Sequence, residues 1–233
     1  MSKPICTVVG VGPGNGSAIA RRFSKEGYRV ALLARTTDFS QTLADELDGA
    51  QAYACDVTDS ASVEQAFAKI RTGFGDVDAL IYNAGSGSWG TVEEITPKDF
   101  EINWRVNALG ALLTAQQVIP AMKRSGRGNI IFIGATASRR GAAHTAAFAP
   151  AKAAQRSLAE SMARHLWPAG IHVAIVIIDG VVDLPKARER MRDKPDEFFV
   201  KPDGVADTVF LLTGQHRSTW SFEVEARPFS ESW

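Results

Sequence analysis

Short apolar segments alternate with longer helical segments along almost the whole chain, and this alternation limits the fold more than any other feature. Several apolar segments carry hydrophobic residues at consecutive positions, as in the stretches IIFI and VAIVII. Both faces of such strands must be buried, which is typical of a parallel sheet covered by helices on each side. The predicted strands are Ile5–Val9, Arg29–Leu33, Ala50–Ala54, Ala79–Tyr82, Asn129–Ile133, His172–Ile178 and Ser221–Ala226.

The segments between these strands have the apolar spacing and the terminal residues of helices. Thr96 followed by Pro97, for example, indicates a helix start, because threonine caps a first turn and proline fits it. The predicted helices are Ser17–Glu26, Asp59–Arg71, Thr96–Met122, Phe148–Trp167 and Asp203–Thr213. Strands and helices that alternate in this way form right-handed crossovers. The sequence therefore predicts an α/β fold with one domain over residues 1–233, a doubly wound parallel sheet of about seven strands with helices on both faces.

The stretch 179–201 differs from the rest of the chain. It is rich in charged residues and contains Pro185 and Pro195. Such a composition favours irregular structure over a long helix or a buried strand. We predict a long loop or lid here, on the side of the sheet where a substrate would bind.

Charge and hydropathy exclude several classes of protein. Lys and Arg number 26, as do Asp and Glu, and this balance argues against a nucleic-acid or anionic-membrane binder. No apolar stretch approaches the roughly 20 residues that cross a bilayer, and no signal peptide is visible. We therefore expect a cytoplasmic protein with no nucleic-acid or membrane partner. Cys6 and Cys55 lie in apolar stretches, so we expect core thiols rather than a disulfide or a metal site.

A glycine-rich turn follows the first predicted strand, with the sequence GVGPGNG at positions 10–16. Glycines let the backbone turn sharply and approach a pyrophosphate, and the helix that follows offers free N–H groups and a partial positive charge. A tight turn without a ligand is the simpler alternative. Its place between the first strand and the first helix favours a dinucleotide phosphate site formed by Gly10, Gly14, Asn15 and Gly16.

The spacing of these glycines resembles the G-x-x-x-G-x-G turn of the short-chain dehydrogenase/reductase family, and further motifs follow in the family's order. The resemblance covers nearly the whole chain and implies a Rossmann-like fold. The matching residues after the glycine turn are Asp56 and Val57 after the third strand, Asn83, Ala84 and Gly85 after the fourth, Asn107 in a helix, and Lys152 in the helix after the fifth strand.

The resemblance also implies a role for each residue. Asp56 and Val57 would hold the adenine ring, and Asn83, Ala84 and Gly85 would support the sheet beside the cofactor ribose. Asn107 would belong to a proton relay, and Lys152 would bind the nicotinamide ribose. Non-catalytic alternatives stay open for four of them: a capping residue at position 56, a structural side chain at 83, a buried polar group at 107 and a solvated lysine at 152.

Two positions depart from the family's pattern. Its acid–base tyrosine stands four residues before the lysine, where this chain has Phe148, and its serine after the fifth strand is replaced by Ala135. A phenyl ring has no proton to give, so proton delivery must be atypical. Candidate substitutes are Thr136, Ser138, His144, and Lys152 acting with a water chain through Asn107. For the first three, an ordinary loop residue is the alternative.

The end of the second strand bears on the choice of dinucleotide. An NAD site usually has an acid there, on the ribose hydroxyls, but this chain has Ala34 followed by Arg35. A guanidinium suits a 2′-phosphate, so Arg35 favours NADP over NAD. Asp38 is the nearby acid that would reverse this choice, and a surface role for Arg35 is the simpler alternative.

The substrate site is expected beyond the carboxyl ends of the strands. Its predicted walls are 86–91 with Trp89, 136–145, and the loop after Asp179. Arg139 and Arg140 would attract an anionic substrate there, unless they are a solvated pair. The resemblance further implies a homodimer or homotetramer that pairs through the helices carrying Asn107 and Lys152.

Together these features predict an NADP-dependent oxidoreductase that acts on a small carbonyl or alcohol substrate, with catalytic roles for Asn107 and Lys152. Two alternatives stay open. One is a dinucleotide-binding protein without redox activity, which would be a sensor or an assembly subunit. The other is an enzyme that uses the same site for non-redox chemistry.

Overall fold

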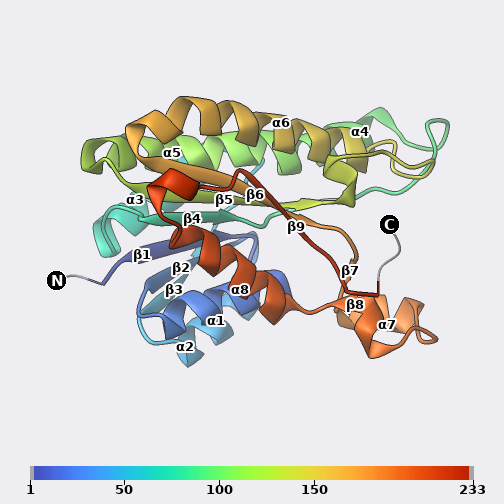
Figure 1. Ribbon diagram of the computed structural model, residues 1–233, viewed down its shortest axis with the longest axis horizontal. Helices are drawn as coiled ribbons and strands as arrows, with labels where there is room; N and C mark the ends of the chain where they lie inside the picture. Colours follow the sequence, from blue (N-terminus) through green and yellow to red (C-terminus); the bar gives the residue numbers. More distant parts are fainter. Residues whose placement is uncertain (1–2, 231–233) are drawn as a thin grey trace.

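A seven-stranded parallel sheet forms the centre of the computed structural model, which describes residues 3–230 (Figure 1). The strand order is β3-β2-β1-β4-β5-β6-β9. The order runs outward from β1 to β3 on one side and from β4 to β9 on the other, so the sheet is doubly wound as predicted. The strands are β1 Ile5–Val9, β2 Arg29–Ala34, β3 Ala50–Ala54, β4 Ala79–Tyr82, β5 Gly128–Ala135, β6 Ile171–Ile178 and β9 Glu223–Ala226.

Helices cover both faces of the sheet and form two separate apolar cores with it. One core contains residues of α3, α5 and α6, and the other contains residues of α1, α2 and α8. Figure 1 shows α5 and α6 above the sheet and α1, α2 and α8 below it. The helices are α1 Asn15–Lys25, α2 Asp38–Glu46, α3 Ser60–Gly73, α4 Pro97–Trp104, α5 Gly110–Ser125, α6 Phe148–Leu166, α7 Pro185–Arg190 and α8 Pro202–Thr213.

The structure contains a helix between β2 and β3 that the sequence pattern does not predict. Helix α2 is only nine residues long and buries Ser40, Leu43 and Ala44. Two of these three residues are small, so the helix has no clear apolar stripe in the sequence. It packs beside β3, where a short connection suffices to cover the end of the sheet.

The prediction of one continuous helix from Thr96 to Met122 was wrong. A π-helical turn at Arg105–Leu109 separates α4 from α5. Side chains bind backbone carbonyls at this point: Asn107 Nδ2 donates to Asn103 O at 2.9 Å, and Tyr82 Oη donates to Val106 O at 2.5 Å. Gly110 lies so close to Tyr82 that a Cβ atom there would be 2.4 Å from the phenol oxygen. Turns of this kind are frequent at functional sites, and this one carries Asn107.

The prediction of a long loop over 179–201 was also wrong in part. This stretch contains α7 and two short parallel strands, β7 Val181–Val182 and β8 Phe199–Val200. Asp183 holds them together, because its carboxylate accepts hydrogen bonds from Arg188 at 2.6 Å and from Lys201 at 2.7 Å. In Figure 1 the segment lies beyond one end of the sheet. Its role as a lid stays a prediction.

Both cysteines are buried and free, as predicted. Burial raises the pKa of the Cys6 thiol well above its ordinary value and that of Cys55 to about 11, so both are protonated core groups. Within residues 3–230, none of the helices combines the length and the hydropathy that a membrane span requires.

Candidate functional site

The structure brings two of the predicted motifs together at the carboxyl ends of β1 and β4. Asn83, directly after β4, donates a hydrogen bond from Nδ2 to the carbonyl of Gly10, directly after β1, at 2.7 Å. Gly10 has φ of 90°, and a Cβ atom on it would lie 2.4 Å from the backbone nitrogen of Ala84. A side chain at position 10 is therefore excluded by both conformation and space. Asn83 has a structural role here, whatever further role it has toward a ligand.

The glycine turn continues directly into α1. A Cβ atom on Gly16 would lie 2.6 Å from the Gly10 carbonyl oxygen, so the first turn of the helix packs tightly on the loop. Gly12 faces open space, since a Cβ atom there would meet nothing within 4 Å. The buried Asn15 Oδ1 has no hydrogen-bond partner among the described residues. The start of a helix, a close backbone and open space at Gly12 fit a dinucleotide pyrophosphate.

The stretch after β7 contacts the same turn, which the sequence did not predict. A Cβ atom on Gly14, where φ is 121°, would lie 2.4 Å from the Cδ2 atom of Leu184. A cavity of about 410 Å³ lies beside this contact. It is lined by residues 13, 14, 17, 18 and 21 of the turn and α1, and by residues 183–185 and 201–203. The 179–201 stretch thus packs on the predicted phosphate site.

Asp56 and Arg35 lie near one another at the adenosine side of the predicted cofactor site. The Asp56 carboxylate accepts hydrogen bonds from the backbone N–H of Thr58 at 2.9 Å and from its hydroxyl at 2.7 Å. These bonds, and to a smaller extent the charge of Arg35, lower the pKa of Asp56. The side chain therefore stabilises the turn after β3 and stays ionised. This structural role is the alternative that the sequence left open for position 56. Arg35 is exposed at the end of β2.

Asn107 is fully buried, and only the nitrogen of its side-chain amide has hydrogen-bond partners among the described residues. Nδ2 donates to Ser86 O at 2.8 Å as well as to Asn103 O, which fixes the orientation of the amide. Its Oδ1 atom has no hydrogen-bond partner within the described part of the chain and lies near Gly85. A buried acceptor without a protein partner is expected to bind a water molecule or a ligand hydroxyl. This geometry suits the predicted relay, which stays a prediction.

Lys152 is buried in α6, with 6% of its surface exposed, so it is not a solvated lysine. Its ammonium donates to Ile133 O at 2.8 Å and to Gln155 Oε1 at 3.0 Å. Burial lowers the pKa of this amine to about 8. Gln155, which is also fully buried, was missed at the sequence level. The available signal was a polar residue three positions after the lysine on an otherwise apolar helix face.

Phe148 begins α6, one turn before Lys152. Its ring lies beside that of Trp89, with the centroids 5.2 Å apart. The nearby hydroxyls already have partners: Thr136 donates to Asp179, and Ser138 Oγ accepts from the backbone N–H of Ala135 at 3.1 Å. His144 is exposed on its loop. Among the candidates for proton delivery, Lys152 is therefore the best placed by burial.

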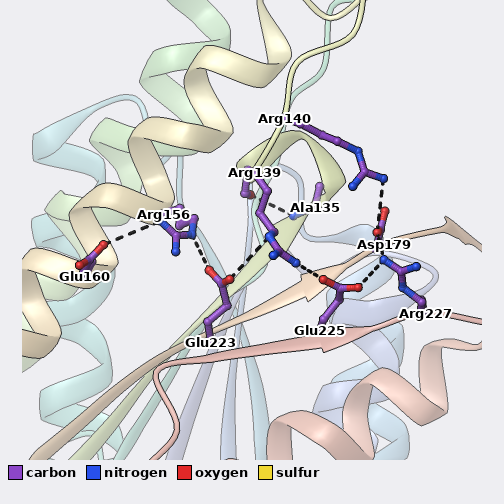
Figure 2. A network of polar contacts seen from close by, with 10 residues as sticks. Ala135, Arg139, Arg140, Arg156, Glu160, Asp179, Glu223, Glu225 and Arg227 are labelled. Carbon is purple, nitrogen blue, oxygen red and sulfur yellow. Dashed lines mark hydrogen bonds and ion pairs between the residues drawn. The ribbon is translucent and has the colours of Figure 1, made fainter. Parts of the chain in front are cut away.

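A chain of ion pairs runs beside this site, from the loop after β5 to the sheet edge (Figure 2). Arg139 pairs with Glu223 and Glu225 of β9, and Arg140 lies 3.6 Å from Asp179. Asp179 also pairs with Arg227. Both arginines predicted to attract an anionic substrate are exposed, and each also pairs with an acid of the chain itself.

Residues 4–195 match the family model described as short chain dehydrogenase. The chain belongs to this family. It is 33% identical over 219 residues to the 3-oxoacyl-(acyl-carrier-protein) reductase MabA of Mycobacterium tuberculosis, which covers 91% of this chain and 85% of the reductase. That reductase is one of many relatives of this short-chain dehydrogenase, so the likeness by itself assigns no substrate.

Solved structures agree with the family and with the fold. An actinorhodin polyketide ketoreductase with NADPH is 27% identical, with a TM-score of 0.89 and 98% of each chain covered. A metagenomic short-chain oxidoreductase in complex with NADP is 28% identical, with a TM-score of 0.84 and 99% of each chain covered. The Rossmann-like fold predicted from the sequence is thus confirmed for this short-chain dehydrogenase.

Proposed function

We propose that this short-chain dehydrogenase is an NADP-dependent oxidoreductase that interconverts a carbonyl compound and an alcohol. The observation that carries the proposal is the buried Lys152, whose amine is fixed by Ile133 and Gln155 one helical turn after Phe148. A buried cation costs free energy unless it is used or paired, and no carboxylate pairs with this amine in the described residues. Membership of an oxidoreductase family and NADP-bound structural relatives support the proposal.

The residues present fit the dinucleotide. The glycine turn would hold its pyrophosphate, Arg35 and Asp56 its adenosine half, and Asn83 and Lys152 its nicotinamide half. When bound, NADP(H) supplies or accepts the hydride. Arg35 favours NADP over NAD, because its exposed guanidinium at the end of β2 suits a phosphate and Ala34 offers no carboxylate for ribose hydroxyls.

Lys152 is the proposed proton donor in place of a tyrosine. With a pKa of about 8, the amine is mostly protonated at neutral pH and still gives up a proton readily. Two of its three hydrogens are used by Ile133 and Gln155, which leaves one to serve the reaction. The unpaired Asn107 Oδ1 would hold the water that returns a proton to the amine.

The test is to titrate NADPH by fluorescence and then to follow its oxidation with a panel of ketones and aldehydes. Lys152→Met should lower turnover by about 10²–10⁴-fold, the usual contribution of acid–base catalysis. Lys69→Met, at an exposed position of α3, serves as the control and should leave turnover unchanged. Tight NADPH binding without turnover, together with turnover in a Phe148→Tyr and Ala135→Ser double variant, would contradict the proposal.

A further inference from the structure

Trp89 is an exposed aromatic residue beside Phe148, which precedes the proposed proton donor Lys152 by one helical turn. Two thirds of its surface, 66%, faces solvent, although its ring packs against Phe148 at an interplanar angle of 41°. Gly87 lies against the same pair, since a Cβ atom on it would lie 3.4 Å from each ring, an ordinary contact distance. The exposed indole offers a flat apolar face beside Phe148, and a ligand that covered it would gain the free energy of burial.

The loop that carries Trp89 is fastened on both sides of the tryptophan. Before it, the N–H of Ser88 donates to Asn103 Oδ1 at 3.2 Å, and Asn103 Nδ2 donates to Ser88 Oγ at 2.9 Å. After it, the N–H of Gly90 donates to His144 O at 2.9 Å. Asn103 is fully buried. The exposed ring is therefore held in place beside Phe148 by its loop.

The position of Phe148 connects this aromatic pair with the proposed chemistry. Phe148 precedes Lys152 by one turn on the same face of α6, so the aromatic pair lies next to the part of the helix that carries the Lys152 side chain. The polar groups around the rings offer little to a substrate. Ala135 has no hydroxyl, and the Thr136 and Ser138 hydroxyls are already bonded within the chain.

We infer that Trp89 and Phe148 form the surface against which the substrate stacks, and that the substrate is a planar aromatic carbonyl compound or the matching alcohol. The inference rests on the proposed function and adds the substrate class to it. Stacking on a fixed indole orients a flat ring and compensates for the missing orienting hydroxyls. A saturated ring of the same size gains apolar contact but no face-to-face geometry.

The experiment compares matched pairs of ligands on the NADP-loaded protein: acetophenone with cyclohexyl methyl ketone, and 2-acetonaphthone with its decalin counterpart. Dissociation constants are measured by calorimetry, which needs no turnover. We expect the aromatic member of each pair to bind more tightly, by about threefold to tenfold. Trp89→Ala should remove that preference and raise KM for aromatic ketones more than it lowers kcat. Equal affinity within both pairs would overturn the inference.

Variants separate the possible explanations. Phe148→Leu keeps an apolar side chain without a ring and should weaken the preference, while Trp104→Ala, at another exposed tryptophan, should leave it unchanged. A Trp89→Ala protein that changes its oligomeric state but keeps the preference would show that Trp89 contacts another copy, and would overturn the inference. NADPH binding is measured on each variant. Its absence from the unaltered protein would count against the proposed function, whereas its presence with no aromatic preference would count against the substrate class alone.

Discussion

At the scale of single residues, the pair Lys152 and Gln155 is the most informative feature of the chain. An ammonium group can only donate hydrogen bonds, so the atom 3.0 Å away must be the amide oxygen of Gln155. The amide nitrogen then points elsewhere, and it has no partner among the described residues. A glutamine that is fully buried with one unsatisfied end costs free energy, which is tolerable where it fixes a functional amine.

Substitutions at Gln155 should therefore change the pKa of Lys152. Gln155→Leu removes a hydrogen bond to the charged amine and should lower this pKa by about one pH unit, since such bonds are worth about 1.5–3 kcal/mol. In the proposed mechanism carbonyl reduction requires the protonated amine, so the rate should begin to fall at a lower pH than in the unaltered protein. Gln155→Glu should shift the fall to higher pH. Gln116→Leu, exposed on α5, is the control. Identical pH–rate profiles for all variants would contradict this role.

Arg35 permits a second test at this scale. Arg35→Ala should weaken NADPH binding about tenfold and affect NADH binding much less, because only NADPH carries the 2′-phosphate that a guanidinium binds. Both affinities are measured by fluorescence titration. The matched control is Arg164→Ala, at an exposed arginine of α6 on the far end of the helix from Lys152. Equal losses for the two dinucleotides would reverse the choice of NADP.

At the scale of elements, the sequence predicts regular strands well and local departures from regularity poorly. β1, β3 and β4 begin and end as predicted. β1 and β4 are buried throughout and are runs of apolar residues, whereas β3 is a partly exposed edge strand. The π-helical turn was missed, since the carbonyls that Asn107 and Tyr82 bind become neighbours only after folding. The same holds for the candidate site. The glycine turn is visible in the sequence, whereas the contact of Leu184 with Gly14 depends on the packing of a distant segment.

The tight packing at the start of α5 leads to a prediction about stability. A methyl group at Gly110 would lie 2.4 Å from Tyr82 Oη and 2.8 Å from Val57 Cβ, so Gly110→Ala should destabilise the protein by about 1–3 kcal/mol. Gly204→Ala in α8 is the matched control, because a Cβ atom there meets nothing within 4 Å, and it should stabilise by about 0.5–1 kcal/mol. Denaturant unfolding measures both free energies. If Gly110→Ala proved neutral or stabilising, the side chains around position 110 would have to move apart without cost, which would contradict the prediction.

At the scale of the whole molecule, the last strand and the last helix are joined to the sheet through His172. This residue of β6 is buried, its Nε2 lies 2.9 Å from Ser221 O, and its Nδ1 lies 3.2 Å from Leu212 O. The ring stacks on Trp220 with the centroids 4.8 Å apart. A neutral imidazole donates from one nitrogen only, so one of the two carbonyls receives no hydrogen bond from the ring. Burial nevertheless dominates and lowers the pKa of His172.

This pKa makes the stability of the fold depend on pH. The native state keeps His172 neutral in a range where the unfolded chain binds a proton, so stability is complete above pH of about 6.5 and is lost as the pH falls toward the native pKa. The free energy of unfolding should therefore be lower at acidic than at neutral pH. In His172→Gln part of that difference should disappear, whereas His144→Gln, at an exposed position, should keep it. The same pH dependence in both variants would exclude His172 as the cause.

The ion pairs of Figure 2 also bear on aggregation, because they lie on an edge strand of the sheet. β9 is one of the two edge strands of the sheet, so the backbone N–H and C=O groups on its outer side are a template for the strand of a second, misfolded chain. Glu223 and Glu225 lie on that strand, and the arginines that neutralise them come from the molecule's own loops and helices. A strand that added at this edge would meet the charged side chains of this network, and charged side chains on an edge strand disfavour such pairing. The ion pairs on β9 thus protect this edge against strand addition and also connect the last strand with the rest of the fold.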